Sequence, residues 1–269
     1  MRLLIIVGLF VLQNHLVFSQ SARGTVIDKG SGKPIPYVNM GIKNQNFGTI
    51  SDEDGRYQFS FSENQLDDTI TIQHVSYESN FIPVKELIDK DSIYLKEKVA
   101  TLDEIKITSR KLKPRKFGIR THNPLLHSRL GIHENTISEI AQEIKINKPI
   151  RLLDLNLFVR IYSDSLPLKY RVKFYTSIDD TPGELIGNSD IVAEGLIPKW
   201  NRVDLKRYNI VMEKDFFVSV EFLPISDGEM PYLSPGCVLV GGNRYSRDTS
   251  LGTWEKDMGG YTLYITGEY

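Results

Sequence analysis

The stretch Gly24–Phe61, GTVIDKGSGKPIPYVNMGIKNQNFGTISDEDGRYQFSF, decides how the first part of the chain folds. Apolar side chains recur there at every second position: Val38, Met40 and Ile42 share one face of a candidate strand. The cluster Asp28–Gly32 precedes this run and is rich in residues that tolerate positive φ, as turns require. The stretch therefore predicts short strands joined by tight turns.

The same period returns after the next turn. Phe47–Ser51 is a candidate strand, and Tyr57, Phe59 and Phe61 alternate with polar residues in another. Asp54-Gly55 between two such runs is a β-hairpin signal. Repeated strand–turn–strand spacing without a helical period predicts an antiparallel sandwich.

These motifs, followed by Ile70–Tyr77, resemble the carboxypeptidase regulatory-like domain over Ala22 to Thr108. Ser76 stands where the family usually has glycine, and Leu102–Ile107 resembles the segment that commonly closes the module. The residues that carry the resemblance are Gly24, Gly32, Pro34, Val38, Gly48, Thr49, Asp52, Asp54, Gly55, Tyr57 and Phe59. The resemblance implies a seven-strand transthyretin-like β-sandwich, which also heads many TonB-dependent outer-membrane receptors of Gram-negative bacteria. It implies a structural or docking module without catalytic residues.

Composition limits the classes of protein. The 269 residues are 41% hydrophobic and 25% charged, which is typical of a globular chain of about two domains. The net charge of −1 gives no general attraction to nucleic acid. Cys237 is the single cysteine, so no intrachain disulfide can form.

The N-terminus has the pattern of a signal peptide over residues 1–19. Arg2 precedes the apolar run Leu3–Leu12, and Ser19 is a suitable residue for cleavage. The run is too short to span a bilayer, and no later stretch is long and apolar enough. We therefore expect an exported protein, periplasmic or associated with the outer membrane or surface of a Gram-negative bacterium.

A basic segment follows the first sandwich, and we assign residues 109–116 to a linker. No acidic residue intervenes in the whole segment, whose basic residues are Lys106, Arg110, Lys111, Lys113, Arg115, Lys116, Arg120 and Arg129. Pro114 is expected to interrupt any regular element. A solvated linker is the favoured interpretation, and a patch for lipopolysaccharide phosphates, other anionic glycans or an acidic partner is the alternative. Nucleic acid is not expected as a partner, because aromatic residues are almost absent there.

Residues 117–269 are predicted to form a jelly-roll-like β-sandwich. Leu153–Ile161 and Tyr170–Thr176 alternate clearly, whereas Ile137–Ile146 fits a helix or a strand. Trp200–Ile210 is similar to galactose-binding-like jelly rolls. The further candidate strands are Ile191–Ala193, Trp200–Leu205, Ile210–Met212, Phe216–Phe222, Val238–Val240 and Tyr261–Thr266.

No catalytic motif is present in the sequence, and we predict no enzyme activity, no cofactor and no metal site. Cys237 enters an apolar run and is interpreted as a core residue. His122, His127 and His133 lack a regular metal-ligand spacing. His74 alternates with Ile70 and Ile72 and is interpreted as a core or interface histidine.

One loop has a composition suited to a ligand. Asn243, Tyr245, Arg247 and Trp254 lie in a glycine-rich stretch, and an aromatic face beside polar donors can stack on a sugar ring. The alternative is a loop whose aromatic side chains cap the core.

The sequence thus predicts an all-β, non-enzymatic cell-envelope protein with a docking sandwich and a second binding or interaction sandwich. Its expected partner is an envelope protein or a glycan. The alternatives are a carbohydrate-binding module, an accessory component of an outer-membrane uptake system, and a hydrolase with unrecognised catalytic carboxylates.

Overall fold

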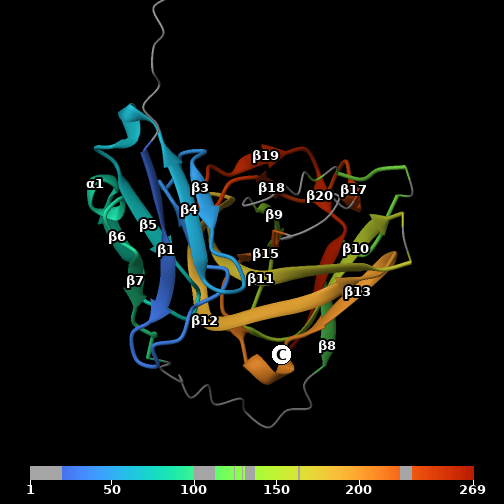
Figure 1. The fold of residues 1–269 in the computed structure, drawn as a ribbon. Helices are drawn as coiled ribbons and strands as arrows, with labels where there is room; N and C mark the ends of the chain where they lie inside the picture. The colour runs from blue at the N-terminus through green and yellow to red at the C-terminus, as the bar shows by residue number, and fades with distance from the viewer. Residues whose placement is uncertain are drawn as a thin grey trace, which may run out of the picture.

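The computed structural model describes residues 20–99, 113–123, 125–128, 130, 137–162, 164–224 and 232–269. Nearly all regular elements in these ranges are β-strands, so the predicted all-β class is confirmed. The strands form two groups: β1–β7 lie on the left of Figure 1, and β8–β21 extend from β12, beside the first group, to the right. The predicted signal peptide, residues 1–19, and the segment Leu102–Ile107 lie outside the described residues.

The N-terminal sandwich consists of two sheets. The three-stranded sheet has the order β4 (Arg56–Phe61), β1 (Gln20–Asp28) and β7 (Ser92–Leu95), with β1 and β7 parallel. The four-stranded sheet has the order β3 (Gly48–Ile50), β2 (Asn39–Gly41), β5 (Thr69–Gln73) and β6 (Asn80–Pro83). The short helices η1 (Glu63–Gln65) and α1 (Val84–Leu87) complete the sandwich.

The predicted alternation places the core correctly but not the strand partners. Val38, Met40 and Ile42 are all buried, as expected. The predicted hairpin at Asp54-Gly55 is wrong, because β3 pairs with β2 while β4 pairs with β1. The turn therefore connects the two sheets, since alternation determines which side chains face the core and not which strand lies alongside. Asp52 Oδ1 accepts hydrogen bonds from the amides of Asp54 (2.9 Å) and Arg56 (2.8 Å), which confirms the turn role of this segment.

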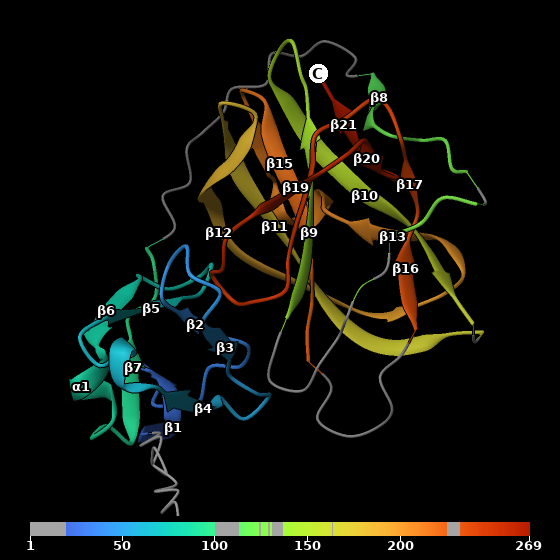
Figure 2. The same cartoon turned by 90° about the horizontal axis from the view of Figure 1, so that it is seen from above.

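The second sandwich also has two main sheets (Figure 2). The first has the order β13 (Lys199–Asp204), β10 (Ile150–Ile161), β21 (Leu263–Glu268) and β8 (Pro114–Gly118), with β14 (Val211–Met212) and β16 (Leu233–Pro235) also paired to β10. The second has the order β12 (Thr181–Leu196), β11 (Leu166–Ile178), β15 (Phe216–Phe222), β9 (Ser138–Ile144), β18 (Arg244–Arg247) and β19 (Glu255–Asp257). The remaining elements are η2 (Lys206–Tyr208) and the pair β17 (Cys237–Val238) and β20 (Gly260–Tyr261).

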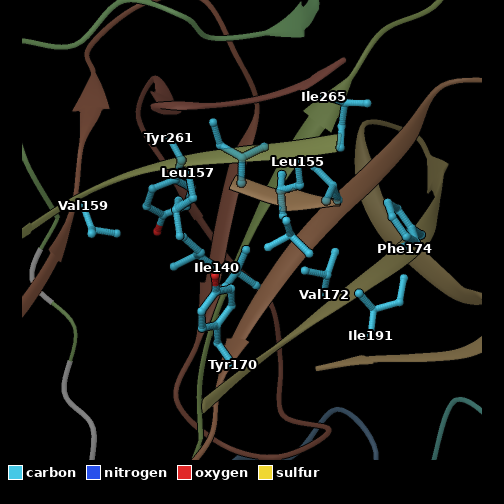
Figure 3. Close-up of a cluster of buried hydrophobic side chains, with 14 of the residues drawn as sticks. Ile140, Leu155, Leu157, Val159, Tyr170, Val172, Phe174, Ile191, Tyr261 and Ile265 are labelled. Carbon is cyan, nitrogen blue, oxygen red and sulfur yellow. The ribbon is translucent and has the colours of Figure 1, made fainter. Parts of the chain in front are cut away.

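The apolar core of this sandwich lies between its two main sheets. Figure 3 shows Leu155 and Leu157 of β10 facing Val172 of β11, with Ile140 of β9 beside them. Burial of each such side chain contributes about 1.5–3 kcal/mol relative to exposure. Cys237 belongs to the same core, as predicted.

Three sequence expectations are resolved or corrected in this sandwich. The ambiguous segment Ile137–Ile146 contains the strand β9, which lies between β15 and β18 and is buried on both faces. Pro114 does not interrupt a regular element but begins β8, where a strand tolerates proline at its first residue. Residues 114–116 therefore lie in a sheet, not in a solvated linker. The predicted strand Val238–Val240 ends at Val238, and Val240 is 85% exposed.

Candidate functional site

A row of four charged residues crosses the outer face of the second sandwich. In register, Arg171 (β11) pairs with Glu221 (β15), Glu221 with Glu139 (β9), and Glu139 with Arg247 (β18). All four are buried, although they lie on the face of the sheet that points away from the apolar core. Isolated charges are costly to bury, so each of these groups needs a partner of opposite charge.

Lys173 lies in the next row and links the two glutamates. Its Nζ is 2.5 Å from Glu221 Oε1 and 3.7 Å from Glu139 Oε2. Arg247 binds Glu139 Oε2 through Nη2 at 2.6 Å, and Arg171 Nε donates to Asp190 Oδ1 of β12 at 2.7 Å. We call Arg171, Lys173, Glu139, Glu221, Arg247 and Asp190 the interface network. It balances three cations with three carboxylates.

The N-terminal sandwich covers this network with its four-stranded sheet. Asn39 of β2 donates through Nδ2 to Glu221 Oε1 at 2.7 Å, and its Oδ1 accepts from Lys173 Nζ at 3.2 Å. Arg171 Nη1 donates to the carbonyl oxygen of Tyr37 at 2.8 Å. The two sandwiches therefore share one buried set of hydrogen bonds.

His74 joins the network through Asp190. Its Nε2 lies 3.4 Å from Asp190 Oδ2, and its Nδ1 accepts a hydrogen bond from the Ser76 amide at 3.2 Å. Burial lowers the pKa of His74, and the nearby charge of Arg171 adds to this effect although Asp190 opposes it. The neutral ring with its proton on Nε2 fits both contacts. His74 is thus an interface histidine, as the sequence indicates.

Glu139 and Asp190 of the network are held in the ionised form. Burial by itself would raise the pKa of Glu139, but the charges of Arg247 and Lys173 outweigh it and lower the pKa to about 2. Burial by itself would also raise the pKa of Asp190, but the hydrogen bond from His74 and the charge of Arg171 lower that pKa to about 2. Because its pKa is about 2, Glu139 is not a proton donor near neutral pH, and because it is fully buried, it is not accessible to a substrate.

A pair of glycines completes the interface. Gly41 and Gly48 lie opposite each other on β2 and β3, and a Cβ there would approach the Ser250 carbonyl oxygen to 2.6 and 2.2 Å. The loop between β18 and β19, which contains Ser250, also forms hydrogen bonds with the tip of the β2–β3 hairpin. The Asn44 amide donates to Leu251 O at 3.1 Å, and Thr253 Oγ1 donates to Asn44 O at 2.9 Å. The missing side chains leave room for the backbone of the second sandwich.

The four predicted ligand residues lie near this interface, on β18 and the adjoining loops. Arg247 has its guanidinium 4.2 Å from the centre of the Trp254 ring, and Trp254 also contacts Tyr175 edge-on. Tyr245 is buried and donates to Asp180 O at 3.0 Å, and Asn243 Nδ2 donates to Glu143 Oε2 at 2.7 Å. Each residue thus has a contact within the protein, and sugar binding through them stays a prediction.

Of the three histidines considered as metal ligands, His122 and His127 line one cleft, but no described contact joins them. His122 stacks on Phe158, His127 forms an isolated bridge with Gly236, and His133 lies outside the described residues. Among the residues with a described structure, no group of three or more His, Cys, Asp or Glu side chains is arranged to hold a metal ion.

Sequence reasoning missed the interface network. Arg171 and Lys173 alternate with Tyr170, Val172 and Phe174, which is the usual pattern of a strand with one solvent-exposed face. Nothing in that pattern shows that another sandwich covers the polar face. The signal available was indirect: Glu139 and Glu143 in the ambiguous segment 137–146 and Glu221 within an apolar strand.

Comparisons with known proteins support the resemblance of the first sandwich. Residues 22–107 match the CarboxypepD_reg-like domain family. The TonB-dependent receptor P39 of Formosa agariphila (strain DSM 15362 / KCTC 12365 / LMG 23005 / KMM 3901 / M-2Alg 35-1) is 33% identical over 94 residues, which are 34% of this chain and 8% of the receptor. The chain thus matches only a small part of that receptor's length.

Two solved structures resemble the chain only distantly. The structures of the Gt and Gx strains of infectious bursal disease virus are each 11% identical and cover 94% of this chain and 60% and 64% of their own chains. Their TM-scores of 0.28 and 0.29 are too low to indicate a shared fold.

No helix in the described part of the chain has the length and apolar character needed to cross a membrane. The resemblance indicated by Gly24–Phe61 is therefore confirmed: residues 22–107 carry a CarboxypepD_reg-like domain.

Proposed function

We propose that this chain is a non-enzymatic interaction protein of the bacterial cell envelope, in which the CarboxypepD_reg-like sandwich is fixed on the second sandwich. The envelope location is supported by the receptor relative and by the signal-peptide pattern of residues 1–19. The TonB-dependent receptor relative also supports an accessory role in outer-membrane uptake.

The interface network is the observation that carries this proposal. Asn39, Lys173 and Glu221 join the sandwiches through groups that are at most 4% exposed. Such buried, hydrogen-bonded charges are costly to separate, because each freed group would have to be paired again or hydrated. The two sandwiches therefore act as one rigid unit, and partners bind to the surfaces that remain outside the interface.

Two edge strands of the first sandwich are suited to such contacts. Phe81 on β6 is 63% exposed and Tyr94 on β7 is 56% exposed. Each strand ends its sheet, so each also offers unpaired backbone groups. Figure 1 shows β6 and β7 on the side of the first sandwich that faces away from the second.

The hydrolase alternative has less support. Glu139 and Glu221 are opposed on neighbouring strands, as a catalytic pair of carboxylates would need to be, but both are fully buried and both are paired with Lys173. These carboxylates serve the interface.

Cell fractionation followed by in-cell cross-linking tests the proposal. We expect the tagged full-length chain in the envelope fraction, cross-linked to a partner through photoreactive groups placed at positions 81 or 94. Groups at exposed positions 147 and 214 of the second sandwich serve as controls. Recovery of the chain in the cytoplasm, or equal cross-linking from all four positions, would contradict it.

A further inference from the structure

A strip of aromatic side chains crosses the other sheet of the second sandwich, on its outer face. Trp200 (β13) pairs in register with Phe158 (β10), and Tyr264 (β21) pairs with Asn156 two residues before Phe158. The Phe158–Trp200 and Trp200–Tyr264 ring centres are 5.4 and 5.1 Å apart, with the rings edge to face. The N-terminal sandwich covers the opposite sheet, so this face is left uncovered by it.

The strip differs from the core residues that alternate with it. Leu157 and Val159, on either side of Phe158, are buried in the core, whereas Phe158, Trp200 and Tyr264 are partly exposed. Trp200 contacts both other rings, so the three rings form one continuous aromatic surface that is longer than either ring-to-ring distance. That length exceeds a single ring and suits a ligand made of successive rings.

The strip ends in a cleft of about 220 Å³. Phe158 belongs to both, and His122 stacks on its ring at 4.4 Å between centres with 15° between the planes. Gly236 forms part of the wall, and a Cβ there would come within 2.8 Å of the Phe158 ring. The Phe158 ring can therefore occupy this position only because residue 236 has no side chain.

The charge of the cleft is positive. Arg160 and Lys199, both exposed, contribute to its lining together with His122 and His127, and the described residues that line it include no carboxylate. Lys116 lies 4.8 Å from the Tyr264 ring centre at the other end of the strip. The cleft beside the β11–β12 turn is the opposite case, because Asp179, Asp180, Glu213 and Asp215 line it. An anion is favoured at the first cleft and not at the second.

The backbone at Lys199 is held in an unfavourable conformation. Its φ is +81°, a value that L-residues rarely adopt. Asn201 fixes the preceding turn, accepting from the Ile197 amide and donating to the Ile197 carbonyl oxygen, each at 2.8 Å. Strained backbone is common where a side chain must be placed for binding.

We propose that the strip and cleft bind a saccharide chain that carries carboxylate, sulfate or phosphate groups. The sugar rings pack on Trp200 and on the Phe158–His122 stack, since aromatic faces offer broad apolar contact to flat ligands. The anionic group lies between Arg160 and Lys199, where charge-assisted hydrogen bonds stabilise it. This site is separate from the loop of Trp254 and from the interface network.

Binding of a protein that comprises residues 20–269 to four polymers tests the proposal: polygalacturonate, heparin, neutral dextran and oligothymidine. We expect binding to polygalacturonate or heparin at low salt, weakening as salt rises, and no binding to dextran. The double variant Arg160→Gln/Lys199→Gln should bind the anionic saccharide about tenfold more weakly or worse. The control Arg23→Gln/Lys29→Gln removes the same charge from exposed positions of the N-terminal sandwich and should bind normally.

A second pair of variants separates this site from the other aromatic loop. Trp200→Ala should weaken saccharide binding with a thermal transition still present, whereas Trp254→Ala should leave it unchanged. Tighter binding of oligothymidine than of either saccharide would replace the saccharide with a single-stranded nucleic acid and overturn the proposal. Absence of saccharide binding, or equal binding by the Arg160/Lys199 double variant, would also overturn it.

Discussion

Glu139 and Glu221 lie directly opposite each other on neighbouring strands, and both are fully buried. Like charges in direct opposition destabilise a sheet unless cations lie between or beside them. Lys173 contacts both carboxylates, and Arg247 and Arg171 flank the pair. The stability of this arrangement therefore depends on Lys173 between the two acids and on one arginine beside each of them.

We expect Lys173→Met to destabilise the protein by about 3–5 kcal/mol, because it leaves two buried carboxylates with too few cations. The free energy of unfolding in urea measures the effect. Lys169→Met is the matched control on the same strand: its ion pair with Glu53 also joins the two sandwiches, but the two side chains are 34% and 62% exposed, so the change should be about 0–1 kcal/mol. Equal losses for the two variants would show that the network does not carry the interface.

Asn39 gives a test from the other side of the interface. Asn39→Ala removes a donor to Glu221 and an acceptor from Lys173, both buried. Hydrogen bonds to charged groups contribute about 1.5–3 kcal/mol, so a loss of that size is expected in the unfolding free energy. Asn147→Ala, at an exposed position, should be nearly neutral. Limited proteolysis should also cut the Asn39→Ala variant faster than the parent protein. An unchanged rate of cleavage would show that the two sandwiches hold together without this residue.

The sequence was sufficient for the local part of the fold. Alternation in Tyr57–Phe61 reflects side chains that face a core on one side, so this strand could be predicted. The largely apolar run Phe216–Phe222 also predicted a strand, which is buried along its whole length. Strand partners were less accessible: Asp54-Gly55 has the composition of a hairpin, yet it connects two sheets. Turn composition reports local backbone angles and not long-range pairing.

The interface could not be predicted for a related reason. A polar face that is covered and a polar face in solvent have the same alternation, as Arg171 and Lys173 illustrate. The candidate site at Trp254 was chosen from composition, which identified aromatic and polar residues but not that Arg247 pairs with Glu139. The aromatic strip was hidden because Phe158, Trp200 and Tyr264 are far apart in the sequence and meet only through strand order.

Gly48 connects the family motif to the interface. Gly48→Ala would place a Cβ 2.2 Å from the Ser250 carbonyl oxygen, so the loop must move, at a cost of about 1–3 kcal/mol. Gly30→Ala is the control, since its Cβ would meet Asp28 at an ordinary 3.4 Å. Thermal unfolding of both variants measures the difference. A Gly48→Ala protein as stable as the parent would contradict the close approach.

Stability should decrease in mildly acidic solution through His74. Its folded-state pKa lies below the ordinary value of 6.5, so its contribution is complete above pH 6.5 and is lost as pH falls through the lowered value. Glu139 and Asp190, with pKa values of about 2, lose theirs only below about pH 4.5. For the parent protein, the urea concentration at the unfolding midpoint, measured from pH 8 to pH 5, should therefore decrease once the pH is below 6.5. His74→Gln should flatten that decrease, and an unchanged slope would exclude His74 as its source.

Lys199 allows backbone strain and binding to be separated. Lys199→Gly relieves a φ of +81° and should stabilise the fold by about 0.5–1 kcal/mol, after allowance for the greater entropy of glycine in the unfolded chain. Lys199→Ala keeps the strain and should give no such gain, while both variants lose the charge and should bind anionic saccharide equally weakly. Lys214→Gly, at an exposed position without positive φ, should instead lose about 0.5–1 kcal/mol. Urea unfolding and saccharide binding of the three variants decide the matter: a Lys199→Gly protein that is less stable than the parent would show that the backbone there is not strained.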